Sequence, residues 1–186
     1  MAKENGELRT VLDSLPPTIP TSILLRKPDN TDGAAVWSLI KECRPLDVNS
    51  MYCNLIQCEH FGQTCVLAEH GGDVVGWISA HLIPDDPRTL FVWQVAVSEK
   101  ARGQGLGQRM LRELIGREAC AGVRQIKTTI TKDNAASWAL FSRFAEREGA
   151  GMQSEAHFQH DEHFACQHDT EHMVTITLGN GLSAAA

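Results

Sequence analysis

Three glycines, Gly103, Gly105 and Gly107, follow an apolar stretch at residues 90–97 (LFVWQVAV). A loop between a strand and the start of a helix exposes backbone N–H groups, and the helix dipole adds partial positive charge there. Glycine lets the backbone approach an anion closely, so a phosphate group is the natural ligand of such a loop. The alternative is that the three glycines only form a tight turn.

Two common phosphate-binding motifs do not fit this loop. A dinucleotide fingerprint G-x-G-x-x-G that started at Gly103 would need a third glycine where Gln108 stands. A P-loop would end in G-K-S or G-K-T, and the sequence contains neither. The spacing that does fit is R-x-x-G-x-G, from Arg102 to Gly107.

A second group of reactive side chains lies near the end of the chain. Residues 157–172 (HFQHDEHFACQHDTEH) hold five of the eight histidines together with Cys166. Imidazole and thiolate bind zinc, and His-rich tracts do bind metals, but the spacing H-x2-H-x2-H-x2-C matches no zinc pattern. Side chains alternate in direction along a strand, which would scatter these groups. We therefore expect a His-rich loop beside a substrate pocket and no metal site.

The elements that position these residues alternate between strand and helix patterns. The sequence predicts a single α/β domain over residues 22–179, a mixed twisted sheet with helices on both faces. Residues 1–21 are predicted to be a flexible N-terminal tail and residues 180–186 a C-terminal tail. The expected strands are 22–27, 64–69, 74–83, 90–97, 125–131, about 152–158 and about 172–178, and the expected helices are 31–43, a segment within 47–61, 106 to about 122, and 134–148.

Composition narrows the class of protein. A net charge of -6 argues against nucleic acid as a partner, because phosphate binding calls for a basic face. No apolar run reaches the roughly 20 residues of a membrane-spanning helix, and the first residues do not resemble a signal peptide. We therefore expect a cytoplasmic protein with no membrane partner, whose six cysteines are reduced and mostly buried.

In combination, three motifs resemble the Gcn5-related N-acetyltransferases. They are R-x-x-G-x-G after the strand WQVAV, the strand QIKTTIT behind the next helix, and the helical segment KDNAASWALFSRF. The resemblance covers roughly residues 22–178 and implies that family's fold, with acetyl-CoA as co-substrate. The residues it implies for binding the cofactor are Val95, Val97, Arg102, Gly103, Gln104, Gly105, Leu106, Gly107 and Asn134.

The chain departs from that family at two positions. Many members carry a carboxylate general base on the strand before the loop, but residues 90–94 include no group that can take a proton. Many members also carry a tyrosine that reprotonates the CoA thiolate, and here Phe141 stands at the matching position. The acid and the base must therefore come from elsewhere in the chain or from solvent.

A narrower resemblance rests on residues 44–52 (RPLDVNSMY), 91–97 (FVWQVAV) and 168–171 (HDTE). These segments are similar to the diaminobutyrate acetyltransferases of ectoine biosynthesis. The similarity implies transfer of acetyl to the γ-amine of L-2,4-diaminobutyrate, which gives Nγ-acetyl-diaminobutyrate. It also implies a homodimer that contributes to compatible-solute synthesis under osmotic stress.

The same resemblance indicates the acceptor site. Asp47 and Glu171 would bind the amines, Trp93 would line the pocket, and Tyr52 would be the catalytic proton carrier. Each residue also has a structural alternative. Asp47 could cap the second helix, Trp93 could lie in the core, Glu171 could be a solvated charge, and Tyr52 could be half-buried on an apolar helix face.

Two other functions remain open at this point. One is an acetyltransferase of the same fold that acts on another small amine. The other is a non-catalytic CoA-binding module, which the two departures from the family pattern would explain.

Overall fold

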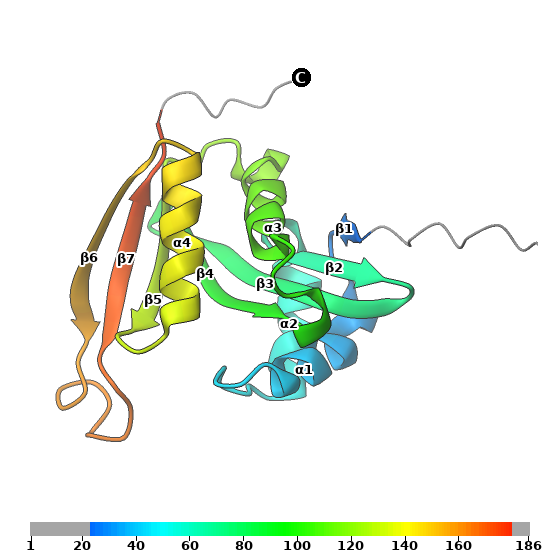
Figure 1. Cartoon of the computed structure of the whole chain (residues 1–186), viewed down its shortest axis with the longest axis horizontal. Helices are drawn as coiled ribbons and strands as arrows, with labels where there is room; N and C mark the ends of the chain where they lie inside the picture. Colours follow the sequence, from blue (N-terminus) through cyan, green and yellow to red (C-terminus); the bar gives the residue numbers. More distant parts are fainter. Residues whose placement is uncertain (1–22, 180–186) are drawn as a thin grey trace, which may run out of the picture.

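The protein is built on one sheet of seven strands in the order β1-β2-β3-β4-β5-β7-β6, seen in Figure 1. The computed structural model describes residues 23–179, and the predicted tails 1–21 and 180–186 lie outside the described residues. Strands β4 and β5 run parallel and the other neighbouring pairs are antiparallel. The predicted mixed sheet is confirmed. Its strands are β1 (Leu24–Arg26), β2 (Val66–His70), β3 (Asp73–Ile83), β4 (Asp86–Val97), β5 (Gln125–Thr131), β6 (Gly151–Phe158) and β7 (Glu171–Thr177).

Four α-helices cover the two faces of this sheet. They are α1 (Gly33–Glu42), α2 (Met51–His60), α3 (Leu106–Ile115) and α4 (Ala135–Arg147). Helices α3 and α4 enclose the larger core with β2 to β5 and β7, and α1 and α2 enclose a smaller core that contains Trp77 of β3 (Figure 1). Among residues 23–179, no helix is both long and apolar enough to span a membrane.

A bulge in strand β4 changes which of the two cores its side chains face. Ser79 of β3 pairs with Gln94, but Ala80 pairs with Val92, so Trp93 is an extra residue without a partner. Such a bulge reverses the alternation of the strand. Val92 therefore contributes to the larger core, while Ala96, an even number of residues later, contributes to the smaller one.

Strands β4 and β5 separate soon after they meet. They pair over three positions only, Thr89 to Phe91 with Gln125 to Lys127. Beyond these pairs the two strands diverge (Figure 1). Parallel strands that separate leave unpaired backbone groups between them, and ligands bind in such openings.

Several boundaries differ from the sequence predictions. Strand β4 begins at Asp86 because the hairpin from β3 is tight, with Ile83 already paired to Asp86. The predicted strand 90–97 therefore begins four residues too late. Helix α3 ends at Ile115 and not near Gly122, as predicted. Gly116 occupies the C-cap position, and the helix does not continue beyond it.

Helix α2 does not bury the face that carries its apolar residues Met51 and Tyr52. Its buried residues are Asn54, Gln57 and Cys58, whereas Met51 and Tyr52 are exposed. The alternative that Tyr52 is half-buried on an apolar helix face is therefore wrong. Asn54 and Gln57 can face inward because the Asn54 amide donates to Gln57 Oε1 at 3.1 Å. Buried polar side chains are tolerated where they bond to one another.

The cysteines follow the prediction. All six are free, and four of them, Cys43, Cys58, Cys65 and Cys120, are buried. Burial raises the pKa of the Cys58 and Cys65 thiols to about 12. These thiols therefore pack as small apolar groups and are not reactive at neutral pH.

Candidate active site

Two adjoining pockets lie where β4 and β5 separate. The first, here called the glycine-loop pocket, has a volume of about 470 Å³ and extends over the loop before α3. The second, here called the strand pocket, has a volume of about 840 Å³ and lies between β4, β5 and the loop that leads into β7. Five residues line both pockets, so they form one continuous channel: Pro45, Leu46, Val95, Asn134 and Ser137.

The glycine-loop pocket gathers the predicted cofactor-binding residues. All of them line it except Gln104. The side chain of Gln104 instead donates through Nε2 to the carbonyl of Lys100 at 3.1 Å, so it is bonded to the loop itself. A contact between Gln104 and a cofactor would therefore have to use its backbone.

Different physical constraints require glycine at the three glycine positions of this loop. Gly103 and Gly105 have φ angles of 75° and 72°, which side-chain-bearing residues rarely adopt. Gly107 lies against α4, since a Cβ there would be 2.9 Å from Leu140 Cδ1. No side chain caps α3 at Gly105, so the first N–H groups of the helix face the pocket with their share of the helix dipole.

Strand β4 supplies backbone groups to the same channel. The carbonyl of Val97 already accepts hydrogen bonds from Arg102 Nε at 3.1 Å and from Cys43 Sγ at 3.4 Å. Val95 has no such side-chain partner and lines both pockets. Of the two predicted backbone contacts, Val95 is therefore the better placed to accept a ligand N–H.

The sequence analysis missed two basic residues of the glycine-loop pocket. Arg44 and Arg143 line it together with Arg102. Three guanidinium groups make this end of the channel suited to phosphate, which Arg binds by charge and by its fork of donors. The position of Arg143 within the motif KDNAASWALFSRF was a signal, because it lies nine residues after the predicted cofactor residue Asn134.

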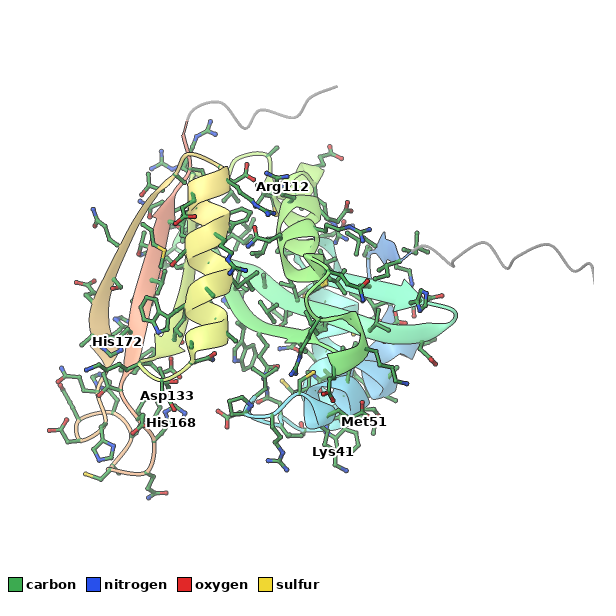
Figure 2. All side chains as sticks on the ribbon, in the orientation of Figure 1. Lys41, Met51, Arg112, Asp133, His168 and His172 are labelled. Atoms are coloured by element: carbon green, nitrogen blue, oxygen red, sulfur yellow. The ribbon has the colours of Figure 1, made fainter. Side chains whose placement is uncertain are left out.

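The strand pocket brings together the three predicted acceptor residues, Asp47, Trp93 and Glu171. They come from the segment before α2, from the bulge in β4 and from the first residue of β7. His168 joins them, with its Nε2 3.8 Å from an Asp47 carboxylate oxygen and 4.0 Å from one of Glu171. The sequence analysis included His168 in the His-rich segment and in the motif 168–171, but gave it no role in the site. Figure 2 shows His168 beside Asp133, at the end of the sheet where α4 begins.

Glu171 is the titratable group that this pocket perturbs. Its side chain is 19% exposed, and burial raises the pKa of its carboxyl above the usual range, an effect that the neighbouring His168 partly offsets. Its Oε2 atom is buried without a hydrogen-bond partner. A carboxylate with a raised pKa in a pocket is a candidate general base, because it can hold the proton that it takes.

Two structural alternatives for the acceptor residues are wrong. Ser50, not Asp47, caps α2, with its side chain accepting from Cys53 N. Trp93 is 48% exposed and lies outside both cores, because the bulge turns it toward the pocket. The Asp47 side chain is 85% exposed, so its carboxylate is free to meet a ligand.

Of the three residues that remain, Asn134 and Phe141 lie in the pocket wall and Tyr52 lies on the surface. Asn134 lines both pockets and also caps α4, accepting from Ser137 N at 3.1 Å. Phe141 is buried and lines the strand pocket, so no phenol is present where many relatives carry a tyrosine. Tyr52 is 70% exposed on α2 and is not among the residues that line either pocket.

The His-rich segment forms the loop between β6 and β7, and part of it borders the strand pocket. His160, Cys166 and His168 contribute to the lining. Within residues 23–179, no three His, Cys, Asp or Glu side chains are grouped closely enough to hold a metal ion. Three of the histidines, His160, His163 and His168, have backbone contacts instead, as between His160 Nδ1 and the carbonyl of His168 at 2.8 Å.

The chain is similar to known acetyltransferases. A family model described as the acetyltransferase (GNAT) family matches residues 34–145. The chain is 49% identical over 154 residues to an L-2,4-diaminobutyric acid acetyltransferase of Methylotuvimicrobium alcaliphilum, covering 83% of this chain and 90% of the relative. It is 47% identical over 155 residues to the protein of the same name from Vibrio parahaemolyticus, covering 83% and 86%.

Solved structures give the same result. A diaminobutyrate acetyltransferase of Paenibacillus lautus, in complex with its substrate L-2,4-diaminobutyric acid and coenzyme A, superposes with a TM-score of 0.82 at 40% identity. The match covers 85% of this chain and 96% of that one. An acetyltransferase of Salmonella typhimurium with acetyl-CoA has a TM-score of 0.64 at 19% identity, covering 88% and 99%, which supports the fold alone.

Proposed function

The chain belongs to the acetyltransferase (GNAT) family and, within it, to the L-2,4-diaminobutyric acid acetyltransferases, and we propose that it acetylates the γ-amine of L-2,4-diaminobutyrate with acetyl-CoA. The product is Nγ-acetyl-diaminobutyrate, an intermediate of ectoine biosynthesis by the family resemblance. The observation that carries this proposal is the continuous channel between β4 and β5, with a phosphate-binding loop at one end and carboxylates at the other.

The residues of the channel have distinct roles in this proposal. The uncapped N-terminus of α3 and the glycine loop bind the pyrophosphate of acetyl-CoA, with Arg102 nearby, and Val95 bonds to the pantetheine arm. Asp47 attracts the acceptor's ammonium groups, and the ring of Trp93 limits the volume beside them. Acetyl-CoA supplies an activated thioester, so the reaction calls for no metal.

Glu171 accepts the proton that the acceptor must lose. An aliphatic ammonium has a pKa of roughly 10, so the amine arrives protonated and cannot attack until it gives up a proton. Glu171 takes that proton, the amine nitrogen forms a bond to the thioester carbonyl carbon, and the C–S bond then breaks. The amide nitrogen loses its second proton to solvent or base, and the CoA thiolate gains one. Ser137 lines both pockets, and its hydroxyl is the proton donor that we propose for the thiolate.

The catalytic role of Tyr52 stays a prediction, and the pocket lining gives it no support. The change Tyr52→Phe tests it, because it removes only the hydroxyl from an exposed side chain. A fall in kcat of about tenfold or more in a folded variant would support the prediction. An unchanged kcat would leave Glu171 as the proposed proton acceptor.

We also propose that the enzyme is a cytoplasmic homodimer. Val48, Met51 and Tyr52 form an exposed apolar set at α2, and Met51 is labelled on this surface in Figure 2. Exposed apolar patches commonly mark contacts between chains. Light scattering is expected to give twice the mass of the chain, and Met51→Glu to lower that mass. A monomer at micromolar concentration would contradict the proposal.

The function is tested by release of free thiol from acetyl-CoA in the presence of L-2,4-diaminobutyrate. Ornithine, lysine and spermidine are the comparison acceptors, and NMR of the product identifies the acetylated nitrogen. We expect a strong preference for diaminobutyrate with acetate on the γ-nitrogen. Equal turnover of all four acceptors would favour another small amine, and CoA binding without turnover would favour the non-catalytic module.

A further inference from the structure

Gln94 is a buried polar residue in the wall of the strand pocket. It follows the bulge in β4, is 6% exposed, and is the one polar residue of the stretch 90–97. Its backbone N–H donates to Ser79 Oγ at 3.2 Å, so the hydroxyl of Ser79 replaces the ladder bond that the bulge removes. The position of Gln94 is therefore fixed by the sheet and not by a loop.

The side-chain amide of Gln94 holds the segment that carries Asp47. Its Nε2 donates to the carbonyl oxygen of Asp47 at 2.8 Å. Most of this segment, between α1 and α2, has no regular structure, and the Asp47 side chain is 85% exposed. The place of the Asp47 carboxylate at the pocket therefore depends on its main chain, to which Gln94 is bonded.

The other end of the same amide has no partner. Because the Asp47 carbonyl can only accept a hydrogen bond, the nitrogen of the Gln94 amide must face it and Oε1 must face away. Gln94 Oε1 is buried without a hydrogen-bond partner. Most buried carbonyl oxygens in native proteins are paired. Gln94 is the buried amide side chain that lines the strand pocket, so a ligand N–H that enters this pocket is the donor that we infer for it.

We propose that Gln94 is an acceptor-binding residue that reads an ammonium group of diaminobutyrate through Oε1 and positions Asp47 through Nε2. One rigid amide then links two contacts with the same substrate. This inference rests on the proposed function, since it needs an acceptor that carries N–H donors. It makes the part of β4 after the bulge, and not only the loops around the pocket, a determinant of acceptor recognition.

The change Gln94→Met tests this role, because Met has a similar length and removes both polar ends. We expect the KM for diaminobutyrate to rise by about tenfold or more, with the KM for acetyl-CoA within about twofold of the wild type. If Gln94 acts partly through Asp47, the double variant with Asp47→Asn will raise the acceptor KM by less than the product of the two single effects.

Gln108 provides a matched comparison. It is also buried, donates through Nε2 to a carbonyl, that of Leu140 at 2.7 Å, and has an unpaired Oε1, but it lines the glycine-loop pocket. The change Gln108→Met is expected to alter the KM for acetyl-CoA and not that for diaminobutyrate. Both variants remove one buried hydrogen bond, so a loss of stability alone would affect them alike.

Gln94→Glu is a second test of Gln94, for use if Gln94→Met does not fold. It replaces only the amide NH2 group and keeps an acceptor oxygen. We expect a rise in acceptor KM that is smaller than that of Gln94→Met. A wild-type acceptor KM in either folded variant would overturn the inference, as would a rise confined to the KM for acetyl-CoA. Failure of the wild-type protein to turn over diaminobutyrate would instead overturn the proposed function.

Discussion

The two ends of the channel bind by different physical means. The glycine-loop pocket presents backbone N–H groups, a helix terminus and guanidinium groups, all of which suit phosphate of any kind. The strand pocket presents side chains from segments far apart in the chain, namely Asp47, Trp93 and Glu171. A backbone site recognises a common group, whereas a side-chain site can distinguish one amine from another. Changes at the two ends should therefore affect different kinetic constants.

The largest effect is expected from Glu171→Gln, which keeps the shape of the side chain and removes the base. We expect kcat to fall by about 100-fold or more, with little change in acetyl-CoA binding. The wild-type rate should fall as the pH drops through the raised pKa of Glu171, because the carboxyl is then protonated and cannot accept a proton. The variant should lack this step in its pH profile.

The same change has a consequence for stability with a defined sign. Since burial raises the pKa of Glu171, the folded state favours the neutral carboxyl, and its ionisation above the unfolded-state pKa costs stability. Glu171→Gln should therefore raise Tm at neutral pH while it lowers the rate. Glu155→Gln, on the exposed strand β6, is the control, and equal kinetic losses in the two variants would contradict the assignment.

A smaller effect is expected at the other end of the channel from Gly105→Ala. Gly105 has a φ of 72°, so a Cβ introduces strain of about 1–2 kcal/mol and disturbs the N–H groups of α3. The KM for acetyl-CoA should rise by about tenfold, and the KM for diaminobutyrate should stay near the wild-type value. Steady-state kinetics with each substrate varied in turn measure both constants.

Gly149→Ala separates strain from binding. Gly149 has a φ of 60° and, like Gly105, no atom within 4 Å of a Cβ, but it follows α4 and lines neither pocket. The two variants should lose similar stability in thermal unfolding. If Gly149→Ala raised the KM for acetyl-CoA as much as Gly105→Ala, the glycine loop would owe its role to folding and not to phosphate binding.

The smallest effect is expected from Asp47→Asn. The carboxylate is highly exposed and exposed charge pairs contribute little, so the KM for diaminobutyrate should rise by about fivefold and rise less in high salt. Asp73→Asn, at the exposed first residue of β3, is the control for net charge. An acceptor KM that did not change, or that changed equally in both variants, would remove Asp47 from the acceptor site.

The sequence predicts these two regions unequally for a physical reason. The glycine loop is contiguous in the chain, so the spacing from Arg102 to Gly107 was enough to predict its place between a strand and a helix. The strand pocket is assembled from residues more than 100 positions apart, and Asp47, Trp93 and Glu171 came only from the family resemblance. No local pattern brings such residues together.

The residues that the sequence analysis missed show where pattern reasoning ends. A polar Gln94 within FVWQVAV was visible, but the bulge at Trp93 decides which way it points, and a bulge has no reliable sequence signal. Tyr52 and its neighbours follow helical spacing, yet α2 buries Asn54 and Gln57 because these two bond to each other. His168 was one of five clustered histidines, and only the fold brings it within 3.8 Å of Asp47.

The bulge at Trp93 also restricts how such a strand can evolve. Each side chain after it owes its direction to the bulge. If the same residues paired with β3 without a bulge, Gln94 would turn toward the larger core and Val95 away from the channel. A substitution in residues 94–97 changes one contact at a time, whereas a one-residue insertion or deletion among them would reverse the side chains beyond it and alter the acceptor and cofactor contacts together. The length of this stretch is therefore a constraint in its own right, separate from the identity of its residues.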